Sequence, residues 1–273
     1  MKNYTLTIEA GKIEQQYFCD LWNYRELVFF LAWRDILVRY KQTIIGIAWS
    51  VIRPLLTMIV FTVIFGKLAK MPSDGVPYPI LVYAAMLPWQ FFSCSVSEGG
   101  NSLIANSSMI SKVYFPRIII PTTSMIVSLI DFIISFAILA CLMVWYQFVP
   151  SWQIIAVIPL LLLAATTALG VNYLVSSLNV KYRDFRYVMP FLIQFGLYIS
   201  PVGFSSSVVP EKWKLLYSLN PMVGVIDGFR WAILGQTNIY MPGFIASIAI
   251  SITLFILGFT FFRKMEKEFA DVI

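Results

Sequence analysis

The sequence of 273 residues contains no histidine, and only 12% of its residues are charged. A soluble domain usually carries about 25% charged residues, so half of the usual charge is missing. Without histidine, the chain lacks the commonest general base and the commonest metal ligand. Its three cysteines are scattered without the spacing of a metal site. We therefore expect no metal site and no cofactor in this chain.

A nucleotide-binding P-loop is also missing. The motif G-x-x-x-x-G-K-[ST] cradles the phosphates of ATP with its backbone amides. Gly66-Lys67 is a partial match, but Phe61 stands where the first glycine is required. The Lys and Arg residues behind the net charge of +6 form no basic patch with interleaved aromatics, so we expect no nucleic-acid partner.

Long apolar segments take the place of the missing charge, and 59% of the residues are hydrophobic. A helix needs about 20 apolar residues to cross a hydrocarbon core of about 30 Å. Six segments predict an all-α integral membrane domain over residues 44–262. The predicted spans are residues 44–66, 80–97, 118–145, 154–178, 188–204 and 243–262. The fifth is the shortest and contains Pro190 and Pro201.

An even number of spans places both ends of the chain on the same side of the membrane. Lys and Arg are concentrated in the two terminal segments, residues 1–43 and 263–273, and in the second and fourth connections. The positive-inside rule makes these parts cytoplasmic. The first 43 residues contain no short apolar core followed by a small-residue cleavage site, so we expect no signal peptide.

A different kind of helix is predicted within residues 1–43. At 100° per residue, six apolar side chains share an arc of about 120°. They are Phe29, Phe30, Trp33, Ile36, Leu37 and Tyr40, while Arg34, Asp35, Arg39, Lys41 and Gln42 occupy the rest. This pattern predicts an amphipathic helix in the cytoplasmic interface, with its aromatics toward the acyl chains. The alternative, a small soluble N-terminal domain, has too little sequence to build a core.

The external connection, residues 205–242, contains two apolar pieces that are each too short to cross the bilayer. They are residues 208–219 and 222–234, and they join at Asn220-Pro221. Irregular backbone at membrane depth must be shielded by protein or water. We therefore predict a re-entrant or interfacial helical hairpin between the fifth and sixth spans.

Two charged residues lie inside predicted spans, Arg53 in the first and Asp131 in the third. An ionisable residue in a membrane span is a functional candidate by default. In the structural interpretation, each pairs with the other or with a backbone carbonyl, or Arg53 extends toward the headgroups. An ion-coupled carrier using Asp131 is one alternative function. A membrane-embedded transferase of lipid-linked sugars is another, although it needs convergent acidic residues that the sequence does not suggest.

Four connecting sequences resemble the permease subunits of ABC type-2 exporters, especially those that move bacterial O-antigen, capsule and teichoic-acid polymers. They occur in order and with matching spacing over roughly residues 25–262. They are Arg34-Asp35 and Arg39-Tyr40-Lys41 running into Gly46-Ile47-Ala48-Trp49 with Pro54 downstream; Asn106–Pro121 (NSSMISKVYFPRIIIP); Asn179–Arg186 (NVKYRDFR); and Leu219-Asn220-Pro221-Met222 followed by Phe229-Arg230.

This resemblance implies a homodimeric permease of the bacterial cytoplasmic (inner) membrane, working with two copies of a separate P-loop ATPase subunit. ATP and Mg would bind the ATPase partner, and the substrate would be a lipid-linked polysaccharide. This chain would itself catalyse no reaction. An exporter of a small lipid or a drug is the alternative within the family.

The resemblance also implies three groups of site residues. A coupling loop over residues 98–117 would contact the ATPase, and the external hairpin would act as a gate. The ATPase-coupling candidates are Met109, Ile110, Lys112 and Tyr114, together with Arg183 and Asp184, which form a local salt bridge or contact the ATPase directly. The gate candidates are Asn220, Pro221 and Arg230.

The third group consists of aromatic side chains along a substrate path, where aromatic faces could stack on sugar rings. The candidates are Phe61, Phe65, Trp89, Phe92, Phe195 and Tyr198. Aromatic residues also pack in lipid and form belts at the membrane interface, so ordinary packing is the alternative for each.

Overall fold

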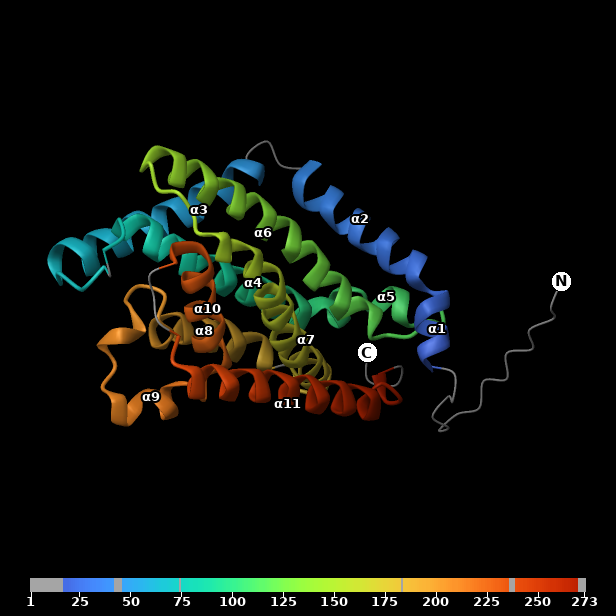
Figure 1. Ribbon diagram of the computed structural model, residues 1–273. Coiled ribbons are helices and arrows are strands. Elements are labelled where there is room, and N and C mark those ends of the chain that lie inside the picture. Colours follow the sequence, from blue (N-terminus) through green and yellow to red (C-terminus); the bar gives the residue numbers. More distant parts are fainter. Residues whose placement is uncertain (1–16, 42–45, 74, 183, 236–238, 270–273) are drawn as a thin grey trace.

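The computed structural model describes residues 17–41, 46–73, 75–182, 184–235 and 239–269, and within these ranges there is no strand. Five helical segments are long and apolar enough to cross a membrane, which confirms the predicted all-α membrane fold (Figure 1). They are α3 (Gly46–Phe61) continued by the π-helical η1 (Thr62–Leu68); α4 (Tyr78–Ala105); α6 (Ile119–Trp145); η2 (Trp152–Ala156) continued by α7 (Val157–Lys181); and α11 (Met241–Met265).

Helix α8 (Phe185–Ile199) corresponds to the fifth predicted span, but it ends at Ile199 rather than at residue 204. Its 15 residues extend about 22 Å, less than the hydrocarbon thickness of about 30 Å. The helix stops because Pro201 has no amide hydrogen and disfavours helical geometry at the preceding residue. That residue, Ser200, has a ψ of 152° and is extended.

Helix α4 lies at the centre of the bundle (Figure 1). In its most apolar stretch 72% of the residues are buried inside the protein, against 33% or less in the other four spans. It packs against α3, α6, α7, α8 and α10. It is also the least apolar of the five spans. This agrees with its position, because lipid-facing surfaces need apolar side chains whereas protein-facing surfaces can pair polar ones.

Hydrogen bonds between polar side chains connect α4 to α7. Asn172 donates from Nδ2 to Ser95 Oγ at 2.9 Å, and Asn179 donates from Nδ2 to the carbonyl oxygen of Gly100 at 2.9 Å. Glycine permits this close approach, because a Cβ atom at Gly99 would lie 2.6 Å from the Asn172 side chain. Such interhelical bonds contribute on the order of 1 kcal/mol each in membrane proteins.

The N-terminal helices α1 (Tyr17–Asn23) and α2 (Arg25–Lys41) precede the first span, and α2 lies along α6 (Figure 1). The outer side of α2 exposes large aromatic side chains, as the predicted arc requires. The predicted arc groups Tyr40 with these aromatics and separates it from Arg39, but the structure places the two side chains together. These two side chains face the bundle, where they bind carboxylates of α4 and α6.

The segment after α8 contains η3 (Ser206–Val208), α9 (Glu211–Tyr217) and α10 (Pro221–Leu234). Pro221 occupies the first turn of α10, where its missing N–H leaves no helical hydrogen bond unmade. Gly235 ends the helix in the left-handed region, with φ of 71°. Most of α10 is buried, and it packs on α4, α7 and α11. A helix too short to cross the bilayer is thus enclosed by protein.

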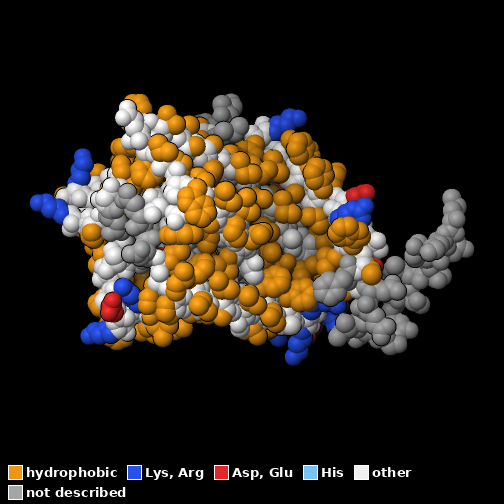
Figure 2. Space-filling view, in the orientation of Figure 1, with side chains coloured by type: hydrophobic (Ala, Val, Ile, Leu, Met, Phe, Trp, Pro, Cys, Tyr) orange, Lys and Arg blue, Asp and Glu red, His pale blue; other side chains and the backbone are white. Residues whose placement is uncertain are grey.

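The surface of the bundle is largely apolar. Figure 2 shows hydrophobic side chains over most of the visible face, with Lys, Arg, Asp and Glu toward its margins. This distribution suits a protein whose solvent is hydrocarbon around its middle and water at its two ends.

The contact between α7 and α11 yields a stability prediction. A Cβ atom at Gly170 would lie 2.6 Å from the backbone of Leu254, and one at Gly258 would overlap the Gly170 carbonyl. We expect Gly258→Ala to reduce the free energy of unfolding by about 1–2 kcal/mol, because overpacking exceeds the helix-propensity gain of alanine. Thermal unfolding in detergent measures this. The exposed position Ala249 on α11 gives the control, Ala249→Val, and equal effects of the two changes would contradict the interpretation.

Candidate functional site

A cluster of charged side chains joins three helices that are distant in the sequence. Arg39 of α2 pairs through Nη1 with Glu98 Oε1 of α4 at 2.8 Å, and through Nη2 with Asp131 Oδ2 of α6 at 2.9 Å. The Tyr40 hydroxyl donates to Asp131 Oδ1. Burial raises the pKa of Tyr40, and its hydrogen bond to Asp131 raises it further. Tyr40 therefore stays protonated and remains a donor.

The sequence did not lead to this cluster. It offered Arg53 or a backbone carbonyl as the structural partner of Asp131, whereas the structure pairs Asp131 with Arg39 and Tyr40. Glu98 was overlooked because the second span was predicted to end at residue 97. Helix α4 continues to Ala105, so Glu98 lies about two turns inside it.

A cavity of about 660 Å³ lies beside this cluster, between α3, α4 and α8. Its wall contains Arg39, Arg53, Gln90 and Gln194 as well as the apolar Trp89. Arg39 is balanced by two carboxylates. Arg53, in contrast, is exposed and makes no ion pair with any residue that the structure describes. The cavity therefore combines an apolar wall with a guanidinium that makes no ion pair there, beside a cluster in which two carboxylates share one other cation.

The aromatic residues predicted for a substrate path do not converge within one chain. Trp89 lines the cavity, with its ring centroid 5.7 Å from that of Phe92. Phe61 and Phe65 pack edge to face, with centroids 5.5 Å apart, and would both contact a side chain at Gly203. These two phenylalanines therefore close the far part of α3 against the loop after α8.

The remaining two aromatic candidates, Phe195 and Tyr198, lie on the outer side of α8, where 53% and 58% of their surfaces are exposed. Phe191, one turn earlier, stacks on Phe195 with ring planes 8° apart. No residue of α8 is fully buried. An aromatic face on a helix that the rest of the chain covers poorly is a candidate contact surface.

The predicted coupling loop, residues 98–117, contains the end of α4, the short helix α5 (Ser107–Ile110) and an irregular return to α6. Lys112 and Tyr114 are exposed, and Met109 is half-buried. Of the candidates in the fourth connection, Asp184 is exposed, while Arg183 lies outside the described residues.

Ile110 differs from the other coupling candidates. Only 5% of its surface is exposed, and it packs in a cluster with Leu31, Phe115 and Phe262. Its assignment as a contact residue is therefore corrected: the side chain supports the loop from within. Sequence reasoning could not separate the two roles, because an apolar residue on a short helix fits both.

Glu266, which sequence reasoning missed, joins the end of α11 to this loop. Its Oε1 accepts from the Arg117 backbone N–H at 2.7 Å, and its carbonyl oxygen accepts from Arg117 Nη1 at 2.5 Å. Arg263 donates to Oε2 at 3.1 Å and stacks on the Tyr17 ring. Burial raises the pKa of Glu266, although the Arg117 amide and Arg263 oppose the shift. The start of α1, the loop and the end of α11 are thus held together.

At the opposite end, α10 and the turn before it are anchored to the loop after α8. Arg230 is 1% exposed and donates to the carbonyl oxygens of Phe204 at 2.8 Å and Val202 at 3.1 Å. Asn220 donates from Nδ2 to Ser200 Oγ at 2.9 Å. Two of the three gate candidates, Asn220 and Arg230, therefore hold the loop that follows α8. The charge of Arg230 is spread over backbone carbonyls, as expected for a cation at membrane depth.

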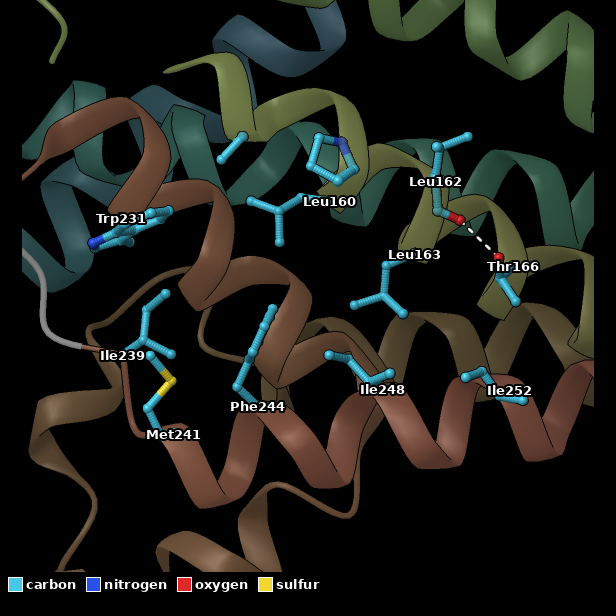
Figure 3. A pocket seen from close by; sticks show the side chains of 12 residues that line it. Leu160, Leu162, Leu163, Thr166, Trp231, Ile239, Met241, Phe244, Ile248 and Ile252 are labelled. Carbon is cyan, nitrogen blue, oxygen red and sulfur yellow. Dashed lines mark hydrogen bonds between the residues drawn. The ribbon is translucent and has the colours of Figure 1, made fainter. Parts of the chain in front are cut away.

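A second hollow, of about 880 Å³, lies between α7, α10 and α11 (Figure 3). Leu160, Leu163 and Phe244 line it. Thr166 also borders it, but its hydroxyl donates to the Leu162 carbonyl at 2.8 Å. This hollow presents no charge, unlike the cavity at Arg53. No three His, Cys, Asp or Glu side chains among the described residues gather as metal ligands.

The family model of the ABC-2 type transporter matches residues 26–234. The chain belongs to the ABC-2 type transporter family. The match runs from α2 through α10, so it includes the ion cluster, the cavity, the predicted coupling loop and the segment with α9 and α10. Glu266 and all of α11 lie beyond it.

Relatives of this ABC-2 chain match over most of their length. An O-antigen export system permease protein of Myxococcus xanthus is 25% identical over 257 residues, which are 93% of this chain and 98% of the relative. One from Klebsiella pneumoniae is 27% identical over 255 residues, 91% of this chain and 95% of the relative. The polysialic acid transport protein of Escherichia coli is 22% identical over 256 residues, 86% of this chain and 91% of the relative.

The ion cluster of this ABC-2 protein makes a testable prediction. Arg39→Gln leaves Glu98 and Asp131 without their cation, and we expect a loss of about 1–3 kcal/mol in the free energy of unfolding. Adding Glu98→Gln should recover part of this loss, because one unpaired carboxylate is removed. Thermal unfolding of the single and double variants measures both effects. Arg25→Gln, at an exposed position of α2, is the control. Strictly additive losses in the double variant would contradict the pairing.

Proposed function

We propose that this chain is the membrane-spanning permease subunit of an ATP-driven exporter for a lipid-linked bacterial polysaccharide of the O-antigen, capsule or teichoic-acid type. The observation that carries the proposal is the extent of the likeness to relatives named for O-antigen export and polysialic acid transport, which covers 86–93% of this chain. The polymer crosses the bacterial cytoplasmic membrane, and the two chain ends face the cytoplasm.

Two copies of a separate P-loop ATPase subunit supply the energy. The sequence of this chain contains no P-loop, so ATP and Mg bind the partner. The coupling tip, which we define as Lys112, Val113 and Tyr114, is exposed and offers the partner a cation, an apolar side chain and an aromatic ring. Met109 and Asp184 flank this contact in the proposal.

Two copies of the permease pair through α3 and α8. In the most apolar stretch of α3 and η1 only 17% of the residues are buried, and α8 contains no buried residue. Helix α8 is also shorter than the bilayer is thick, so a protein neighbour is the economical cover for its aromatic face. The cavity at Arg53 lies between these same two helices, which places the substrate path beside the dimer axis.

The function is tested with the complex purified from its native membrane in mild detergent. A mass equal to two permeases and two ATPase subunits, and an ATP turnover rate that changes on addition of lipid-linked glycan, are expected. An ATP turnover rate that changes with small lipids or drugs but not with the glycan would favour the alternative function, an exporter of a small lipid or a drug. A chain without an ATPase partner would overturn the proposal.

Tyr114→Asp tests the coupling tip. We expect the variant to fold and insert normally but to lose most glycan export, because a charge at an exposed contact weakens docking without disturbing the core. Export in proteoliposomes and the stoichiometry of the purified complex measure this. Ile110→Asp is the matched comparison, and it should instead lower the unfolding temperature because it buries a charge. Normal export by Tyr114→Asp would contradict the coupling assignment.

The dimer face is tested by cross-linking. In a background without the three native cysteines, Phe195→Cys should form a disulfide-linked or reagent-linked dimer in membranes, because residues near a two-fold axis meet their own copies. Gel mobility reports the product. Ile245→Cys, exposed on α11, should stay monomeric. Efficient cross-linking at Ile245 with none at Phe195 would place the dimer contact elsewhere.

A further inference from the structure

The cavity between α3, α4 and α8 contains unused hydrogen-bonding capacity around one cation. Arg53 makes no ion pair within the described chain, and the side-chain amides of Gln90 and Gln194 make no hydrogen bond there. Arg39, on the same wall, is occupied by Glu98 and Asp131. The free donors are therefore one guanidinium and two amides, supplied by three different helices.

These groups lie at a comparable depth in the bundle. Arg53 follows the start of α3 by seven residues, and Gln90 and Gln194 lie further inside α4 and α8. At 1.5 Å per residue, Arg53 is about 10 Å from its helix end, within one leaflet of a bilayer. A cation at this depth is energetically costly unless an anion or water satisfies it.

The cavity also has an apolar wall and lies between two helices that pack little on each other. Trp89 and Leu197 line it beside the polar groups. Helices α3 and α8 both pack on α4, but the described residues show no extensive packing of α3 against α8. An amphiphile could thus place an anionic head at Arg53 while its hydrocarbon chain passes between these two helices.

We propose that Arg53, Gln90 and Gln194 form a binding site for the phosphate ester at the head of the lipid carrier. The inference rests on the proposed function and adds a subsite to it. A guanidinium matches phosphate oxygens with two parallel N–H donors, and the amides supply further donors. The ring of Trp89 lies on the same wall, where the first sugar of the glycan could stack.

The test measures binding of a synthetic lipid diphosphate carrying a short glycan to the permease–ATPase complex in phosphatidylcholine nanodiscs. We expect Arg53→Gln to weaken binding by about tenfold or more, because a charge-assisted bidentate contact is lost. Lys67→Gln is the matched control, since it removes the same charge from an exposed position of the same span. The control should bind as the unchanged protein does.

Three competitors separate the possible sources of the phosphate. The lipid diphosphate without glycan should compete and inorganic diphosphate should compete weakly, both only when Arg53 is present. Competition by phosphatidylglycerol at equal concentration would assign a general headgroup site and overturn the assignment to the carrier. Unchanged binding by Arg53→Gln, or equal loss in Lys67→Gln, would overturn the site. If the protein without substitutions neither exports the lipid-linked glycan nor changes its ATP turnover rate when the glycan is added, the proposed function would instead be overturned.

Discussion

A bilayer offers no hydrogen-bond partner to a polar side chain, and this constraint explains why the bundle is arranged around α4. Helix α4 carries serines, glycines and a glutamate that lipid would not accept. Three of them have partners in the protein: Ser95 and the Gly100 carbonyl accept hydrogen bonds from α7, and Glu98 pairs with Arg39. The more apolar spans are left for the outside, where they need no partner beyond lipid or another copy of the chain.

The same constraint makes α2 part of the bundle, because one of its charged side chains pairs with carboxylates of the spans. Arg39 satisfies carboxylates from two different spans, so removing α2 would leave two partly buried charges unpaired. The exposed aromatics on the other side of α2 are then held at a fixed place against α6. Arg53 is the exception to this pairing, which is why we read it as a site and not as a structural residue.

The sequence predicted the helical membrane fold and the family, because apolar length and the spacing of the connecting motifs are local properties. It could not place residues whose role depends on a distant partner. Tyr40 fits an apolar arc by periodicity, yet it faces inward because its hydroxyl donates a hydrogen bond to Asp131. This partner lies 91 residues later in the sequence. Ile110 fits an exposed contact by its position, yet it is buried in a cluster with residues of α2 and α11.

The end of α8 shows a different limit. Counting apolar residues carried the predicted span past Pro201, although the restriction that proline imposes on Ser200 was available from the sequence. What the sequence could not show is which hydrogen bonds satisfy the polar groups at the end of this helix. The end of α8 and the non-helical segment after it are acceptable at depth because Tyr217 donates to the Ile199 carbonyl, Asn220 to the Ser200 hydroxyl and Arg230 to the Phe204 carbonyl.

Contacts between α2 and α4 connect the proposed coupling tip to the cavity. Arg34 bonds Asn106 Oδ1 at 3.0 Å, directly after α4, and Arg39 pairs with Glu98 about two turns earlier. Helix α2 therefore braces the last turns of α4, and those turns lead without a break into the loop that carries the tip. A displacement of the tip must move this braced unit or break its ion pairs. Because Glu98, Arg39 and Arg53 line the same cavity, such a movement would change the wall to which Arg53 belongs.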